Sequence, residues 1–355
     1  MDFSAYNGPS EEWLKVQETL PAWTFDISVP PVKLRETVNG GREQLAATNF
    51  ANISSRLVTT DYTIPTRDGS QIEARSYRPI SKPKDEELPV YLYFHGGGFI
   101  FGSVASEDAL CGQLALNLDI IVLNVNYRHT PEHPFPDAWH DAQDAYAWLH
   151  DNMSTVGGDV TKIVVGGISA GGQLTASLTL EQNLGKALTN YPKPAGQILM
   201  IPCLAHLETY ADGPAKKLKD PSLSSYVANE NAPLLPKNVI EFFSDLLKSG
   251  TPDPKDTKLN IVGAESEDVK GLPPTVFGIC GLDPLRDEAL FYAKTVSEAR
   301  VPTHTTLIKG VPHGFRRWAS DIKAGKDWDD VVENGIRWVL EKPKATGNFD
   351  IIVKG

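Results

Sequence analysis

A serine flanked by glycines is the sharpest chemical feature of this sequence. Gly167-Ile168-Ser169-Ala170-Gly171 follows an apolar run expected to form a strand and precedes a segment with helical periodicity. A sharp turn from strand to helix requires glycines on both sides of the serine, because neighbouring Cβ atoms would clash. The turn would place the Ser169 hydroxyl at a helix N-terminus, where backbone N–H groups and the helix dipole favour developing negative charge. The pattern therefore predicts a nucleophilic serine.

A second glycine-rich segment follows another expected strand. His95-Gly96-Gly97-Gly98 comes directly after the apolar run 90–94. Glycines leave room for backbone N–H groups to approach a substrate oxygen that side chains would otherwise block. A flexible loop and a phosphate cradle are the alternatives. The sequence contains neither the G-x-x-x-x-G-K-[ST] nor the G-x-G-x-x-G spacing, which disfavours nucleotide binding.

A serine nucleophile needs a base, and the base needs an acidic group that holds its tautomer. In α/β hydrolases these residues follow the serine in the order acid, then histidine. After Ser169 the candidates are His206, His304 and His313. His206 lies in a region without a clear strand, and His304 precedes the last expected strand. His313 follows that strand, at the carboxyl edge of the sheet, and is therefore the predicted base.

Two aspartates compete for the role of the acid. Asp283 comes just after the expected strand 275–279, whereas Asp287 lies four residues further, inside the helix that Pro284 is expected to open. An acidic residue in a first helical turn is explained by the helix dipole or by a partner such as Arg286. Asp283 is therefore the predicted acid.

The elements around these residues alternate between strands and helices. Short, nearly continuous apolar runs, typical of strands covered on both faces, occur at 90–94, 120–125, 162–166, 197–201, 275–279 and 305–308. Helix-like segments lie between and after them, at 106–118, 136–152, 170–182, 285–299 and 328–340. Two β-rich runs, 58–66 and 71–79, flank a turn and predict an antiparallel hairpin. The fold class is thus α/β, a mostly parallel sheet with helices on both faces.

Two segments do not follow the alternation of strands and helices. Residues 1–55 are helical in pattern and broken by Pro21 and Pro30, and residues 205–255 are rich in proline with one expected helix at 237–248. A structureless loop of that length is uncommon in a compact domain. We expect residues 1–55 and 205–255 to form a cap over a catalytic domain made of residues 56–204 and 256–345.

The composition of the chain disfavours some classes of binding partner. The 355 residues include 34 Lys and Arg against 45 Asp and Glu, a formal charge of −11, without a basic block. This disfavours nucleic acids and anionic membranes as partners, so a small molecule is expected. No apolar run is long enough to span a bilayer, no signal peptide is evident, and the three cysteines are widely spaced. We expect a cytoplasmic protein without metal or cofactor, and composition leaves a homodimer open.

Taken together, the motifs resemble the hormone-sensitive-lipase-like family of α/β hydrolases. The resemblance rests on five motifs in the right order: HGGG at 95–98, the segment 126–136, GxSAG at 167–171, Asp283-Pro-Leu-Arg-Asp287 and His313-Gly314-Phe315. It covers about residues 58–340 and implies the α/β-hydrolase fold with a helical cap.

The resemblance also implies roles for individual residues. It implies a carboxylic-ester hydrolase with Ser169 as nucleophile, His313 as base and then acid, and Asp283 as orienter. The oxyanion hole would come from the backbone N–H groups of Gly97, Gly98 and Ala170.

Two positions near this site are expected to contact substrate. Phe99 follows the glycines and is expected to wall the pocket, although it could equally be a core residue. Ile168 stands where the family commonly has an acidic residue or threonine, so the elbow is apolar at that point. Both residues suggest an apolar substrate of small to medium size.

Two other functions are compatible with these motifs. A lyase, dehydratase or cyclase could use the same pocket to stabilise an enolate without forming an acyl-enzyme. A ligand-binding receptor on an inactive hydrolase scaffold is the other alternative, but it usually goes with a lost triad histidine, and His313 is present.

Overall fold

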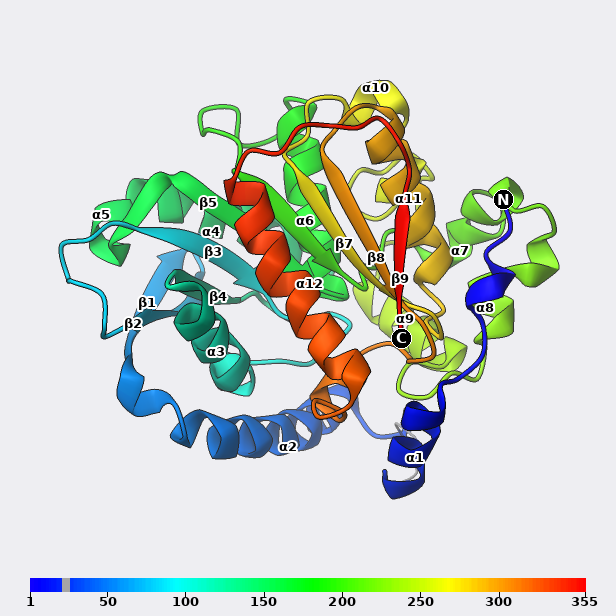
Figure 1. Cartoon of the computed structure of the whole chain (residues 1–355), viewed down its shortest axis with the longest axis horizontal. Helices are drawn as coiled ribbons and strands as arrows, with labels where there is room; N and C mark the ends of the chain where they lie inside the picture. The colour runs from blue at the N-terminus through cyan, green and yellow to red at the C-terminus, as the bar shows by residue number, and fades with distance from the viewer. Residues whose placement is uncertain (21–25) are drawn as a thin grey trace.

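A single, mostly parallel sheet organises the molecule (Figure 1). The computed structural model describes residues 1–20 and 26–355; Pro21, one of the predicted helix breaks, lies outside the described residues. The strand order is β1-β2-β4-β3-β5-β6-β7-β8-β9. The strands are β1 (Leu57–Pro65), β2 (Gln71–Pro79), β3 (Leu88–Phe94), β4 (Ile121–Asn126), β5 (Gly158–Ile168), β6 (Gly196–Met200), β7 (Thr275–Cys280), β8 (Thr303–Ile308) and β9 (Ile351–Lys354). Strand β2 is antiparallel to β1 and β4, and the remaining pairs are parallel.

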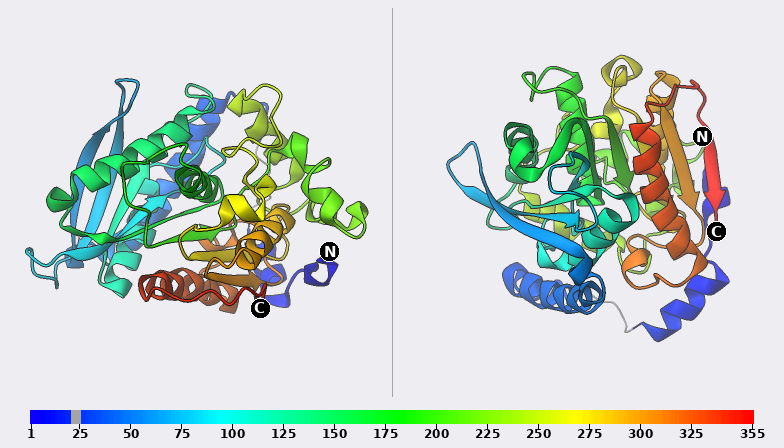
Figure 2. Two further views of the ribbon diagram at one scale, coloured as in Figure 1. Left: turned by 90° about the horizontal axis from the view of Figure 1, so that it is seen from above. Right: turned by 60° about the vertical axis from the view of Figure 1, so that its left-hand side comes forward.

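Helices cover both faces of the sheet, as the apolar runs predict (Figures 1 and 2). Helices α3 (Asp108–Leu118) and α12 (Lys323–Leu340) pack on one face. Helices α4 (Asp137–Asp151), α6 (Ala170–Asn183) and α11 (Arg286–Glu298) pack on the other. The strands are therefore buried on both sides, which explains why they are apolar along their length rather than alternating. The α/β fold class, the hairpin β1–β2 and each predicted strand are confirmed.

Strand β9 was not predicted. It pairs in parallel with β8 and extends the sheet beyond residue 345, where the predicted catalytic domain ends. Its apolar run is only three residues long, Ile351-Ile352-Val353, too short to stand out as a strand. Lys354 ties the strand to α12 through Asp327 Oδ1, at 3.3 Å from its Nζ.

The two segments expected to form the cap contain α1 (Glu11–Thr19), α2 (Pro31–Ala51) and α9 (Lys237–Leu247). Apart from α9, residues 205–255 contain only short helical turns, among them α7 (Leu207–Tyr210) and α8 (Ser225–Ala228), each four residues long. Figure 1 shows α1, α2 and α9 near the carboxyl ends of the parallel strands. This is the edge at which open α/β sheets bind ligands.

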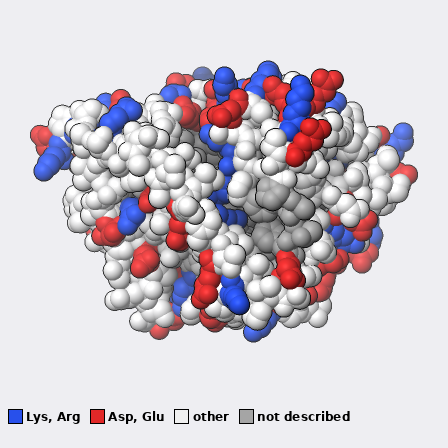
Figure 3. Space-filling view, turned by 90° about the horizontal axis from the view of Figure 1, so that it is seen from below, with Lys and Arg blue, Asp and Glu red and all other residues white. Residues whose placement is uncertain are grey.

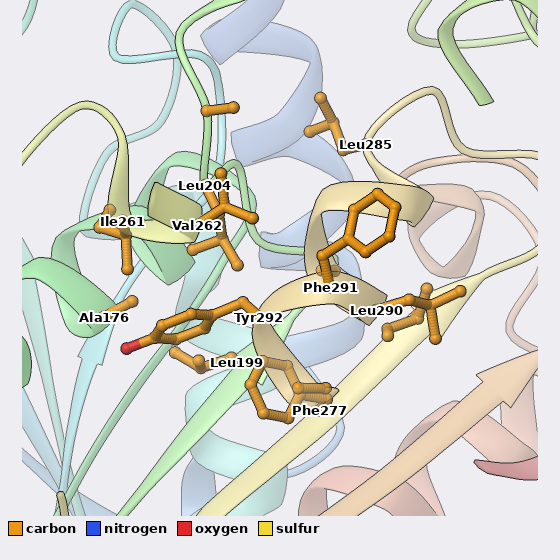
Figure 4. Packing of buried hydrophobic residues seen from close by; sticks show 14 of the residues in the cluster. Ala176, Leu199, Leu204, Ile261, Val262, Phe277, Leu285, Leu290, Phe291 and Tyr292 are labelled. Atoms are coloured by element: carbon orange, nitrogen blue, oxygen red, sulfur yellow. The ribbon is translucent and has the colours of Figure 1, made fainter. Parts of the chain in front are cut away.

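The 205–255 segment shares an apolar core with the sheet. Tyr210, Tyr226 and Ile240 of this segment belong to the same apolar cluster as Phe277 of β7 and Tyr292 of α11. Figure 4 shows part of this cluster, including the flanking residues Leu204, Ile261 and Val262. Burying such side chains contributes about 1.5–3 kcal/mol each. The region that walls the cavity is therefore anchored to the same core as the strands.

A buried carboxylate strengthens this anchor. Glu288 of α11 accepts hydrogen bonds from the Leu204 N–H at 2.6 Å, the Ala205 N–H at 3.2 Å and the Tyr226 hydroxyl at 3.2 Å. Burial raises the pKa of Glu288 well above its usual value, and the two backbone donors oppose that shift. Since a buried polar group without partners costs stability, these contacts hold the segment and helix together.

Candidate active site

Ser169 sits in the turn between β5 and α6, in the strained backbone that a nucleophile elbow requires. Its φ is 56° and ψ is −115°, a conformation that residues other than glycine rarely adopt. The helix N-terminus behind it is closely packed against the neighbouring strand. A Cβ on Gly171 would lie 2.0 Å from the Phe94 carbonyl oxygen, which no real side chain tolerates. The glycine after the serine is therefore required by packing, as the motif predicts.

The three residues selected from the sequence lie in one hydrogen-bonded chain. His313 Nε2 is 2.8 Å from the Ser169 Oγ, and His313 Nδ1 is 2.7 Å from Asp283 Oδ2. Asp283 and His313 are buried, with 1% and 8% of their surfaces exposed. The other carboxylate oxygen of Asp283 accepts from the Leu285 N–H at 2.8 Å, which fixes its orientation. The geometry suits a serine whose proton passes to an oriented histidine.

The rival candidates lie elsewhere. Asp287 accepts hydrogen bonds from Arg286 Nε at 2.8 Å and from the Ser225 N–H at 2.7 Å, so it has the structural role that its helical position suggests. His304 packs against Trp338, with ring centroids 5.9 Å apart. His206 does line the cavity, but its Nε2 lies 3.4 Å from the Ser249 Oγ rather than near Ser169.

The glycine loop provides backbone donors beside the serine. Gly97, Gly98 and Ala170 line the same cavity as Ser169. Within the described residues, none of their N–H groups donates a hydrogen bond to another backbone oxygen. Gly97 has a φ of +142°, and a Cβ there would lie 2.1 Å from the Phe101 carbonyl oxygen. Only glycine fits at this position, which leaves the three N–H groups able to bind a substrate oxygen.

His95 anchors this loop from behind. Its ring is buried and stacks on Tyr127 at a centroid distance of 4.4 Å, and the Tyr127 hydroxyl donates to the His95 carbonyl oxygen at 2.8 Å. Burial lowers the pKa of His95 to about 4. The ring is therefore neutral at physiological pH and packs as an uncharged group under the glycines.

The serine and histidine open onto a cavity of about 470 Å³, a size typical of small-molecule sites. Its wall is mainly apolar, and Phe99 and Ile168, the two predicted substrate contacts, belong to it. The other apolar lining side chains are Val38, Phe101, Ile201, Leu234, Leu235, Ile240, Phe243, Leu247, Leu259, Leu285 and Trp318.

Much of this wall was missed by sequence reasoning. Ile240, Phe243, Ser244 and Leu247 of α9 all line the cavity. They recur at helical spacing of three and four residues, so a helix with one face toward a ligand or core could have been inferred. Val38 of α2 gave no comparable signal. Tertiary packing determines which face of α2 lies toward the cavity.

A charged group at one end of the cavity was also missed. Glu107 is buried, yet it accepts hydrogen bonds from Arg317 Nη2 at 2.6 Å, from the Tyr93 hydroxyl at 3.1 Å and from the Ser106 hydroxyl at 3.1 Å. Burial opposes the charged form of Glu107, but Arg317, His95 and Arg42 together outweigh it and lower the pKa of the carboxyl. Arg42 of α2 lines the cavity near this pair.

The described residues contain no group of three or more His, Cys, Asp or Glu side chains placed to hold a metal ion. Within the same residues, none of the helices has the length and hydropathy needed to cross a membrane.

Comparisons with known proteins show the family to which the chain belongs. A family model described as the alpha/beta hydrolase fold matches residues 91–317. The esterase LipI of Mycobacterium tuberculosis is 33% identical over 270 residues, which cover 76% of this chain and 78% of LipI. The ethyl acetate hydrolase of Pseudomonas putida is 31% identical over 286 residues, 79% of this chain and 81% of that enzyme.

A solved structure extends the likeness to the whole fold. Vibralactone cyclase superposes with a TM-score of 0.81 at 27% identity, covering 95% of this chain and 96% of that one. The family model spans all five motifs on which the resemblance rests, and both relatives are more than 30% identical to this chain. The chain is therefore an enzyme of the α/β-hydrolase family, in its hormone-sensitive-lipase-like group of esterases.

Proposed function

We propose that this enzyme hydrolyses carboxylic esters of small to medium, largely apolar substrates through an acyl-enzyme on Ser169. The observation that carries the proposal is the hydrogen-bonded chain from Ser169 through His313 to Asp283, open to an apolar cavity. The names of relatives support the same reaction, since LipI is an esterase and the Pseudomonas putida enzyme hydrolyses ethyl acetate.

The first half of the reaction forms the acyl-enzyme. The Ser169 oxygen attacks the ester carbonyl carbon while His313 Nε2 accepts the hydroxyl proton. Asp283 holds the ring by its Nδ1 side and stabilises the imidazolium that forms. His313 then gives the proton to the leaving alcohol. In the second half, water adds to the acyl carbonyl by the same route and releases the carboxylic acid.

The glycine loop would stabilise the charge that develops during each half. When the carbonyl carbon becomes tetrahedral, its oxygen gains negative charge that the N–H groups of Gly97, Gly98 and Ala170 would bind. Removing one such donor typically lowers the rate by about 10²–10³-fold. The loop is held in place by packing rather than by substrate, so its donors need no reorganisation during the reaction.

The cavity supports a preference for short to medium acyl chains. A volume of about 470 Å³ suits a small ester rather than a fully enclosed long acyl chain. Aromatic side chains, Phe99, Phe101 and Phe243, contribute to the wall and favour an apolar moiety.

A panel of p-nitrophenyl esters from acetate to palmitate tests both the activity and the size preference. We expect turnover with the highest kcat/KM among the short and medium esters and none with Ser169→Ala. Full activity of Ser169→Ala would refute the role of the serine, and a maximum at palmitate would refute the size preference.

A cyclase is the second candidate, because the solved structure of vibralactone cyclase is similar over nearly the whole chain. In such a reaction the pocket would stabilise an enolate or direct an internal attack, and no acyl group would stay on Ser169. Incubation with substrate followed by intact-protein mass spectrometry separates the two reactions, since only the hydrolase accumulates an acyl adduct when water attack is slow.

A further inference from the structure

Arg42 places a positive charge in the wall of a mainly apolar cavity. It projects from α2 and lines the cavity together with Gly96 and Ser169. Its Nη1 donates to the Gly96 carbonyl oxygen at 3.4 Å, and its guanidinium carbon lies 5.5 Å from the centre of the Phe101 ring. Gly96 precedes Gly97, so the guanidinium stands beside the loop that would hold the reacting carbonyl.

Arg42 lacks an anionic partner in the part of the chain that the structure describes. No carboxylate oxygen lies within 4.0 Å of its guanidinium there. The nearby carboxylate, Glu107, is already engaged by Arg317, Tyr93 and Ser106. Residues 21–25 contain no acidic residue that could supply the missing charge.

The surroundings make this unpaired charge costly. Burial and, after it, the neighbouring Arg317 lower the pKa of Arg42 to about 9, and Glu107 only partly offsets them. Glu107 is the sole acidic residue among the described lining residues, against two arginines. A carboxylate in the cavity would supply the anionic partner that Arg42 lacks among the described residues. A guanidinium binds a carboxylate through two parallel hydrogen bonds.

Basic side chains are also visible in a hollow of the molecular surface (Figure 3). Figure 3 views the face that carries α1 and α2, and it shows basic side chains inside a hollow near the middle of that face. Acidic and basic side chains are both spread over the rest of this face. Although the chain has a net charge of −11, basic groups in this hollow would attract an anionic substrate.

We propose that Arg42 is a specificity-determining residue that binds a carboxylate on the substrate, so that the preferred esters carry a free carboxylate a few atoms from the ester bond. This inference rests on the proposed esterase function. It adds recognition of an anionic group to a pocket whose wall is mainly apolar.

Two pairs of esters of matched shape test the proposal. Monoethyl succinate is compared with ethyl levulinate, which replaces the carboxylate by an acetyl group on the acyl side. O-acetylglycolate is compared with acetoxyacetone, which does the same on the alcohol side. We expect the wild-type enzyme to prefer the anionic member of at least one pair, and Arg42→Gln to lower that kcat/KM ratio about 10- to 100-fold.

The matched control is Arg35→Gln. Arg35 also lies on α2, but it pairs with Glu132 and does not line the cavity. Its variant should keep the ratio of the wild-type enzyme. A purely structural role of Arg42 would lower both members of a pair alike and leave the ratio unchanged, which would overturn the proposal. A wild-type preference for the neutral member of both pairs would also overturn it.

Binding without turnover separates this proposal from the esterase function. Calorimetry with Ser169→Ala should show monoethyl succinate or O-acetylglycolate binding at least tenfold more tightly than its neutral counterpart. The difference should disappear in Ser169→Ala/Arg42→Gln. If the wild-type enzyme hydrolyses neither these four esters nor the p-nitrophenyl esters, the esterase function fails while this measurement still decides anion recognition. Equal binding of both members of each pair would refute the role of Arg42.

Discussion

The triad and the cavity wall are built in different ways. Ser169 follows β5 directly, Asp283 follows β7 by three residues and His313 follows β8 by five, so the parallel strands carry the reacting groups to one edge. The wall facing them comes largely from α2, α9 and short turns. In the proposed mechanism the sheet would therefore position the reacting groups, and the helices across from it would select the molecule that reaches the serine.

The largest effect should come from the triad. Asp283→Asn keeps the side-chain volume but removes the charge that orients His313, and a comparable change in a serine protease lowers kcat about 10⁴-fold. We expect a similar loss of kcat with KM nearly unchanged, measured on p-nitrophenyl acetate.

Asp287→Asn is the matched control, because the same change is made four residues away. It removes the charged partner of the buried Arg286 and should cost about 3–5 kcal/mol of unfolding free energy. The folded fraction should retain kcat within a few-fold. A loss of 10⁴ in kcat for folded Asp287→Asn would show that the acid was assigned to the wrong aspartate.

The next largest effect concerns the glycine loop. Gly97→Ala places a Cβ 2.1 Å from the Phe101 carbonyl oxygen, so the loop must shift and its donors with it. We expect kcat to fall about 10²–10³-fold. Gly185→Ala is the control, since Gly185 also has a positive φ, +70°, but nothing lies within 4 Å of the added carbon. Unchanged kcat in Gly97→Ala would contradict the oxyanion role of the loop.

A smaller effect should follow from changing the wall. Phe243 of α9 lines the cavity and packs edge-on against Phe101 at 5.8 Å. Phe243→Ala should enlarge the pocket and raise kcat/KM for hexanoate relative to acetate about tenfold. Phe242→Ala on the same helix does not alter the lining and should leave that ratio in place. An equal shift in both variants would indicate general loosening of α9.

The smallest effect is a change of stability with pH. The pKa of His95 is about 4 in the folded protein because the ring is buried, against about 6.5 for an exposed histidine. Between these values the unfolded chain binds a proton that the folded chain does not, so stability falls as pH decreases. From this group alone we expect a loss of about 1.5 kcal/mol between pH 6.5 and 5.

Urea unfolding of wild type and His95→Gln at both pH values measures this loss. The variant should lose less stability than wild type by roughly that amount. Parallel losses in the two proteins would mean that His95 takes up its proton in the folded state as readily as in the unfolded one.

The sheet and the residues at its edge were largely predictable. Strands buried on both faces are recognisable in the sequence as apolar runs. The close approach of Gly171 to the Phe94 oxygen requires a glycine, and this glycine is part of the recognisable motif. Ser169, Asp283 and His313 follow such strands at short distances, so chain order and strand position were enough to select them.

The wall of the cavity was less predictable. Arg42 is one of many charged residues on α2, and nothing local in the sequence distinguishes it from Arg35. Arg42 lacks a carboxylate partner because the nearby Glu107 is bound by Arg317, and these two residues are 210 positions apart in the sequence. Strand β9 was missed for a related reason, because its three apolar residues become a strand only beside β8.

The acyl-enzyme is the most direct test of the central claim that Ser169 is the nucleophile. Rapid mixing with p-nitrophenyl acetate should release about one equivalent of p-nitrophenolate in a burst. Quenched samples should show one acetyl group on the peptide that contains Ser169, and neither signal should appear in Ser169→Ala. Turnover without any adduct on that peptide, or the same adduct in Ser169→Ala, would contradict the account.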